Sequence, residues 1–169
     1  LRMEDLRRVM SAFATGVTVI TVGGDSPNGM TVNAFGSVSL DPPLVLCCVS
    51  RTARMHGSLS TGGGFAVSVL NSDQEDVARR FAHPSRPHGW EQFGPPEWRL
   101  GPYTGSPLLA GALAWLECRV VQETVAGDHS VFIARVLDAT TGGVGPALVF
   151  HGSAFHRMRR VSAAEAAAD

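Results

Sequence analysis

Short runs of β-branched and other apolar residues, separated by glycine- and proline-rich turns, recur along this chain and limit it to a sheet-based fold. Composition and length of this kind are typical of β-strands. Helical periodicity is confined to two segments, so strands do not alternate with helices as they do in a parallel α/β sheet. The pattern predicts an all-β dominated barrel with a few peripheral helices. The runs occupy residues 17–22, 44–50, 65–71, 112–124, 130–139 and 148–151.

Two pairs of these runs are placed to form hairpins. Residues 23–29 combine Gly, Asp, Ser, Pro and Asn, and they predict a turn between strand 17–22 and the stretch that follows. Residues 125–129 contain Gly127 and predict a second turn, between the long strands 112–124 and 130–139.

The two helical segments lie at the N-terminus and after residue 71. Ser72 followed by Glu75 matches a capping box and predicts a helix to about residue 82. Apolar residues that recur every three or four positions predict an amphipathic first helix. These residues are Leu6, Val9, Met10 and Phe13. We expect this helix to cover one end of the sheet.

Residues 29–46 carry small and polar side chains where an ordinary strand would carry bulky ones. Thr31, Asn33 and Ser37 supply hydroxyls and an amide. Gly36 permits a bulge or a close approach to the backbone. These groups suit a flat heteroaromatic ligand packed against the strand.

Composition excludes several classes of partner. The chain of 169 residues has a formal net charge of -1, and its basic residues are scattered arginines. Neither a nucleic-acid footprint nor a polybasic membrane patch is present, and we expect no nucleic-acid or membrane partner. One domain over residues 1–160 is the simplest organisation, with residues 161–169 as a flexible tail.

The three cysteines favour a reducing compartment. Cys47 and Cys48 are adjacent and Cys118 is distant, which makes a poor disulfide framework. We interpret them as buried apolar residues of a cytoplasmic protein. No segment has the length of a membrane span.

Three motifs do not fit the structural context that their usual function requires. The glycines at 62–64 precede a strand rather than a helix, so they are not a Rossmann fingerprint. His83 and His88 lack cysteine or carboxylate partners at ligand spacing, and no metal site is predicted. Asp128, His129 and Ser130 are consecutive, so their diverging side chains cannot form a hydrolase triad.

The segment 50–58 leaves a buried strand with arginines, hydroxyls and a histidine. Loop amides, hydroxyls and an arginine fork suit a phosphate dianion, with Ser50, Thr52 and Arg54 as contacts. The alternative is a helix start with solvated arginines. Spacing alone leaves both interpretations open.

Four segments together resemble the flavin reductase-like family: residues 29–46, 48–54, 65–71 and 127–129. The match runs in order from about residue 6 to residue 158. The resemblance implies a split β-barrel that binds FMN or FAD, forms a homodimer and uses NADH or NADPH. It also favours the phosphate interpretation of the 50–58 segment.

The resemblance implies roles for individual residues. It places His129 at the flavin edge facing the nicotinamide, as the catalytic residue, and leaves Asp128 a structural role in the turn. Flavin contacts are implied for Thr31, Val32, Asn33, Ala34, Phe35, Ser37, Ser50, Thr52, Ala53, Arg54, His56 and Phe81.

The function that this reading predicts is the reduction of free flavin by NAD(P)H, with hydride passing from nicotinamide C4 to flavin N5. The reduced flavin would then supply a separate flavin-dependent monooxygenase. Two alternatives remain: a flavin-binding or carrier protein without NAD(P)H turnover, and an oxidase of the same barrel class that retains its flavin.

Overall fold

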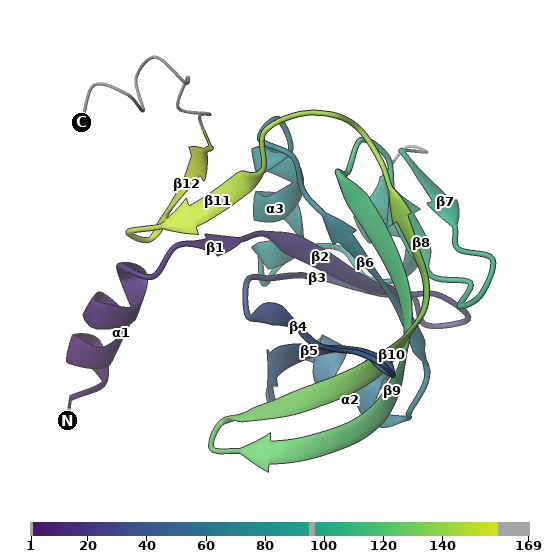
Figure 1. Cartoon of the computed structure of the whole chain (residues 1–169), viewed down its shortest axis with the longest axis horizontal. Coiled ribbons are helices and arrows are strands. Elements are labelled where there is room, and N and C mark those ends of the chain that lie inside the picture. The colour runs from purple at the N-terminus through teal and green to yellow at the C-terminus, as the bar shows by residue number, and fades with distance from the viewer. Residues whose placement is uncertain (1, 95–96, 159–169) are drawn as a thin grey trace.

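One antiparallel sheet of seven strands dominates the structure, in the order β3-β2-β6-β9-β10-β5-β4 (Figure 1). The computed structural model describes residues 2–94 and 97–158, so the predicted tail at 161–169 lies outside the described residues. The sheet consists of β3 (Asn28–Val32), β2 (Thr18–Val22), β6 (Gly64–Val69), β9 (Ala114–Ala126), β10 (His129–Thr141), β5 (Pro43–Ser50) and β4 (Phe35–Leu40).

The two edge strands of this sheet, β3 and β4, are consecutive in the chain. Only Asn33 and Ala34 separate them, and a link of this length spans at most about 10 Å. The two edges therefore lie close together although they do not pair with each other. The sheet curls into a barrel that is open along one seam, which confirms the predicted all-β dominated split barrel.

Both predicted hairpins are confirmed by strand pairing. In β2 and β3, Thr18 pairs with Val32. In β9 and β10, His129 pairs with Ala126, so the loop is two residues long and the strands extend beyond the predicted ends. Gly127, the first loop residue, has φ 65°, a conformation that glycine adopts without steric cost.

The barrel interior is filled by side chains from most of the sheet strands. A main cluster of buried residues includes Ile20, Val49, Phe65, Val67 and Phe132. A second cluster lies between β2 and the helix α3 (Glu75–Ala82), where Phe81 packs on Phe93. These cores fix the strands that carry the candidate site.

Smaller elements surround the barrel. A three-stranded sheet combines β1 (Thr15–Gly16), β11 (Leu148–His151) and β12 (Ala154–Arg157), and a two-stranded sheet combines β7 (Trp98–Leu100) and β8 (Pro107–Leu109). The remaining elements are the helices α1 (Met3–Ser11) and α2 (Arg54–Ser60) and the 3-10 helix η1 (Gly89–Phe93).

The helix α2 is a third helix, and it begins within segment 50–58, where the alternative interpretation expected a helix start. Its local signals are weak, because the N-cap residue Ala53 makes no side-chain cap and Gly57 lies inside the helix. Met55 and Leu59 are fully buried in the main core. Tertiary packing therefore stabilises a helix that local helix propensity alone does not predict.

The capping box predicted at Ser72 is wrong. The helix α3 begins at Glu75, after an N-cap residue, Gln74, that makes no side-chain cap. Ser72 is buried, and the Asn71 side chain instead accepts the N–H of Asp73 at 2.7 Å. A local turn built by Asn71 thus replaces the predicted cap.

The helix α1 does not cover the end of the sheet as predicted. It lies apart from the barrel beside β1 (Figure 1), and none of its residues is buried. Its apolar side chains, together with Phe13 just beyond its end, are largely exposed. The exposed set is Met3, Leu6, Val9, Met10 and Phe13.

Replacing Gly29 by alanine should destabilise the barrel. A Cβ at this position would lie 2.5 Å from Cε1 of Phe81, whose side chain is buried in the second cluster. Overpacking of this kind costs about 1–3 kcal/mol of unfolding free energy. Urea unfolding followed by circular dichroism measures this loss of unfolding free energy.

The matched control is Gly57→Ala on α2, where a Cβ meets nothing within 4 Å. This substitution should stabilise the helix. Equal effects of the two substitutions would contradict the packing at Phe81.

Candidate functional site

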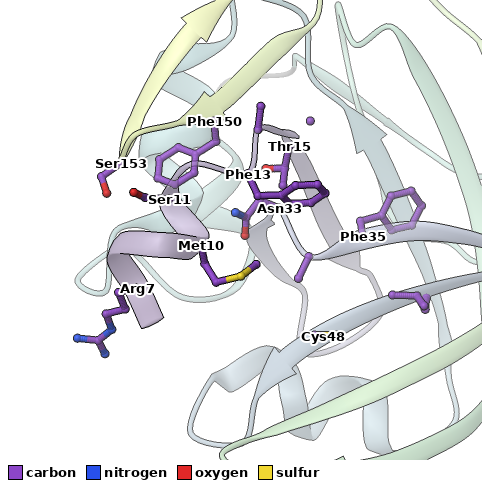
Figure 2. A pocket seen from close by; sticks show the side chains of 14 residues that line it. Arg7, Met10, Ser11, Phe13, Thr15, Asn33, Phe35, Cys48, Phe150 and Ser153 are labelled. Atoms are coloured by element: carbon purple, nitrogen blue, oxygen red, sulfur yellow. The ribbon is translucent and has the colours of Figure 1, made fainter. Parts of the chain in front are cut away.

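A cleft of about 680 Å³ opens where the link between β3 and β4 faces α1 and β11. Figure 2 shows side chains from these separate parts of the chain around it. We call it the main cleft. It is lined by Arg7, Met10, Ser11, Phe13, Ala14, Thr15, Gly16, Asn33, Ala34, Phe35, Leu46, Cys48, Phe150 and Ser153.

The main cleft combines aromatic walls with free backbone donors. Phe13, Phe35 and Phe150 line it, and Phe35 also packs against the main core. The carbonyl of Ala34 accepts the N–H of Cys48 at 2.9 Å, whereas the N–H groups of Asn33 and Ala34 have no acceptor among the described residues. They are free because they lie in the open seam of the barrel. A flat ring with hydrogen-bond acceptors on one edge fits these groups.

The strand β5 extends the main cleft toward His129. Leu46, Cys48 and Ser50 alternate with buried residues along β5, so their side chains share one face of the sheet. His129 pairs directly with Ser50 across the β5–β10 ladder, and paired residues point to the same face. Ser50 lies about 7 Å along the strand from Cys48. His129 therefore lies on the cleft side of the sheet, at the end of β5.

A short hydrogen bond orients the His129 ring. Its Nδ1 lies 2.8 Å from Oδ1 of Asp128. This hydrogen bond and the charge of His129 lower the pKa of Asp128 below its ordinary value, so the carboxylate is ionised at neutral pH. The carbonyl of Asp128 also accepts the N–H of Arg51. The turn is thereby tied to the 50–52 loop, with the Nε2 side of His129 left for a ligand.

The structure separates Arg54 from the other two predicted phosphate contacts. The hydroxyls of Ser50 and Thr52 lie 3.0 Å apart in the loop before α2. The Arg54 side chain instead reaches His88, with 2.7 Å between Nη1 and Nδ1. It lines a different cavity, of about 390 Å³. The predicted phosphate residues thus lie near the start of α2, but Arg54 contacts His88 and lines a cavity that neither Ser50 nor Thr52 lines.

His56 belongs to a partly buried polar network behind His129. Its Nε2 lies 2.8 Å from Oγ of Ser130, and that hydroxyl donates to Glu123 at 3.0 Å. Ser130 has no exposed surface, so it cannot act as a nucleophile. The network joins α2 to the β9–β10 hairpin and supports the position of His129.

Several other predicted residues do not present free side chains. Val32 and Phe81 are buried in the two cores, and Ala53 packs against the main core. The hydroxyl of Thr31 donates to the Ala78 carbonyl at 2.6 Å. Any ligand contact of Val32 or Phe81 must therefore use the backbone. Ser37 is exposed on β4, next to a register shift that confirms a bulge near Gly36.

Sequence reasoning missed the other side of the main cleft. Thr15 and Gly16 of β1, Phe150 of β11 and Met10 and Phe13 of the α1 segment line it. Phe150 is more than a hundred residues from Asn33 in the sequence. It reaches the cleft because β11 pairs with β1, a strand near the other end of the chain. The apolar periodicity of α1 was a visible signal, but it indicated packing rather than a ligand wall.

The two buried cysteines, Cys47 and Cys118, are not suited to act as nucleophiles. Burial raises the pKa of both Cys47 and Cys118 to about 12, so both are thiols rather than thiolates at neutral pH. No group of three or more His, Cys, Asp or Glu side chains suited to a metal ion occurs in the described part of the chain. No helix in residues 2–94 or 97–158 is long and apolar enough to cross a membrane.

Fold and cleft together define a small split β-barrel protein with a cleft where the link between its two edge strands faces α1 and β11. A family model described as a flavin reductase like domain matches residues 10–159. The chain belongs to the flavin reductase-like family.

Three similar proteins match this chain over most of their length. An NADH-dependent FAD reductase of Streptomyces globisporus is 51% identical over 153 residues, which cover 90% of this chain and 84% of the relative. The FMN reductase (NADH) SmoA of Agrobacterium fabrum is 40% identical and covers 93% and 87% of the two chains. The crystal structure of BorF, the flavin reductase component of a bacterial two-component tryptophan halogenase, superposes with a TM-score of 0.90 at 51% identity, over 95% of this chain and 100% of BorF.

Proposed function

We propose that this protein is an NAD(P)H:flavin oxidoreductase that reduces FMN or FAD and supplies the reduced flavin to a separate flavin-dependent monooxygenase. The observation that carries the proposal is the main cleft, where the N–H groups of Asn33 and Ala34, which have no acceptor among the described residues, lie with Phe13 and Phe150 on the His129 side of the sheet. Relatives named as NADH-dependent reductases support NADH as the donor. Relatives named as reductase components of monooxygenases support the recipient.

When bound, the nicotinamide supplies a hydride from C4 and the flavin accepts it at N5. The chain's own residues would hold the rings. The N–H groups of Asn33 and Ala34 would donate to the polar edge of the flavin, where negative charge increases during reduction. Phe13 and Phe150 would pack against the bound rings. His129, oriented by Asp128, would position the nicotinamide from the end of β5.

A matrix of initial rates with both flavins and both nicotinamides tests this function. NADH oxidation that depends on added FMN or FAD is the expected result. A yellow protein that retains flavin and shows no turnover with either nicotinamide would contradict the reductase and favour a flavin carrier.

Replacing Thr52 by valine should weaken FMN binding by about two- to tenfold and leave riboflavin binding nearly unchanged. The Thr52 hydroxyl lies with Ser50 in the loop that we assign to the flavin phosphate, and one neutral hydrogen bond is worth about 0.5–1.5 kcal/mol. Valine keeps the shape and removes the hydroxyl. Fluorescence titration with the two flavins measures the contrast. Equal losses would mean that Thr52 stabilises the loop and does not contact phosphate.

We also propose a homodimer in the cytoplasm, with residues 1–160 as its single domain. The exposed apolar side of α1 supports the dimer, as do the exposed Val121 and Val125 on the projecting β9–β10 hairpin (Figure 1). A second copy of the chain could cover both surfaces. Three free cysteines support a reducing compartment.

A further inference from the structure

The ring of His56, on α2, contacts protein groups through both of its nitrogens. Nε2 lies 2.8 Å from Oγ of Ser130 and 3.3 Å from Oε1 of Glu123. Nδ1 lies 3.4 Å from Oγ of Ser60. The ring also packs edge-to-face against Phe132, with 5.4 Å between the ring centroids. With both nitrogens engaged, the His56 ring has no nitrogen to offer a flavin.

The hydrogen bonds between His56, Ser130 and Glu123 have a fixed direction. A carboxylate oxygen only accepts, so the Ser130 hydroxyl uses its single hydrogen to donate to Glu123, at 3.0 Å. The Ser130 oxygen must then accept from His56, which places a proton on Nε2 of the ring. The three side chains form a chain of hydrogen bonds in which the hydroxyl of Ser130 is the bridge. We call this chain the His56 network.

The His56 network anchors an end of the β9–β10 hairpin that has little other packing. In β9 every residue from 121 to 126 is exposed. A register shift between Ile133 and Ala134 separates this end from the rest of the hairpin. Ser130 is the first buried residue of β10. Pairing with β5 fixes the register of this end, and the His56 network ties it to α2.

Ser130 and His129 are consecutive in β10, so their side chains point to opposite faces of the sheet. Ser130 is held inside by His56 and Glu123, while His129 lies on the cleft side. A rotation of the strand at Ser130 would therefore swing the His129 ring relative to the main cleft. Hydride transfer is sensitive to such changes, because a misplacement of about 1 Å can cost about a hundredfold in rate.

We propose that Ser130 and His56 are positioning residues, which fix through the His56 network the orientation in which His129 meets the nicotinamide. The inference rests on the proposed function, which gives His129 its role. Neither residue contacts a substrate. Ser130 is fully buried, and the His56 side chain is only 18% exposed. Loss of the network therefore impairs the nicotinamide side of the reaction and leaves flavin binding unchanged.

Ser130→Ala removes the bridging hydroxyl and is the primary variant. We expect it to lower kcat/KM for NADH by about two- to tenfold, as for the loss of one hydrogen bond, and to leave the KM for flavin unchanged. The matched control is Ser68→Ala. Ser68 is also fully buried in the seven-stranded sheet, and its hydroxyl accepts the Leu109 N–H at 3.1 Å. S68A should lose a similar amount of stability and keep wild-type kinetics.

A double-substitution cycle separates positioning from a general loss of structure. If Ser130 acts through His129, adding S130A to His129→Ala should cause no further loss of kcat/KM for NADH. The same loss in both backgrounds would overturn the proposal.

Two variants of His56 test the network from its other end, and they replace S130A if that variant does not fold. His56→Gln keeps a side-chain N–H that can donate to Ser130, whereas His56→Leu has none. H56Q should therefore retain more of the wild-type kcat/KM for NADH than H56L. Equal losses in the two variants would contradict the role of the hydrogen bond.

NMR of the ligand-free protein gives a readout that does not depend on turnover. The imidazole signals of His129, assigned by their absence in H129A, should shift in S130A and stay in place in S68A. Unchanged His129 signals in S130A would refute this inference alone, even in a protein that reduces flavin. The expected shift in a protein that reduces no flavin would refute the proposed function alone.

Discussion

Replacing His129 by alanine is expected to lower kcat/KM for NADH by about ten- to a hundredfold, while the affinity for flavin changes little. His129 lies at the end of β5, paired with Ser50 and facing the cleft side of the sheet. Its side chain is 45% exposed, so Nε2 can reach a ligand in the cleft. A hydrogen bond to a charged or charge-developing group is worth about 1.5–3 kcal/mol, which corresponds to this loss.

The neighbouring Asp128 provides a control for the His129 substitution. Asp128→Asn keeps an oxygen that can accept from Nδ1 and should therefore lose far less activity than H129A. Stopped-flow measurement of flavin reduction, together with flavin titration, separates the two effects. Steady-state kinetics of H129A that match the wild type with both cofactors would remove His129 from the nicotinamide site.

The strands of this fold could be predicted because their signals are local. The run at 17–22 is β-branched throughout, the turn after it is rich in Gly, Asp and Pro, and the resulting β2–β3 hairpin is present. The closeness of the two sheet edges could not be predicted from local signals. That β3 and β4 are the two edges, joined by Asn33 and Ala34, depends on the order of all seven strands.

Where local signals and tertiary packing disagree, packing decides. The capping box at Ser72 fails because Asn71 forms a competing turn. The helix α2 forms despite Gly57 because Met55 and Leu59 are buried. In the candidate site, too, some residues could be predicted from local sequence and others could not. Asn33, Ala34 and Phe35 lie in the predicted stretch, whereas Phe150 reaches the cleft through long-range contacts that no motif marks.

Introducing two carboxylates on the apolar side of α1, with Leu6→Asp and Val9→Asp, should convert the proposed dimer to a monomer. Both side chains are exposed in a single chain, at 49% and 67%, and neither lines the main cleft. Burying an unpaired carboxylate costs several kcal/mol, so we expect the dimer dissociation constant to rise by at least about a hundredfold. Size-exclusion chromatography with light scattering at micromolar concentration measures it.

The same double variant tests whether the flavin site depends on the dimer. The helix α1 is held to β11 and β12 by few contacts, among them the bond from Gly152 N–H to Ser11 O, yet Met10 and Phe13 wall the cleft. A partner that packs on α1 would fix this wall, so specific activity should fall with dissociation. Arg8→Asp changes the charge by the same amount on the polar side of the helix, and this control should remain dimeric and active. A wild-type monomer, or specific activity that stays constant through a measured dimer-to-monomer transition, would show that each barrel holds a complete site alone.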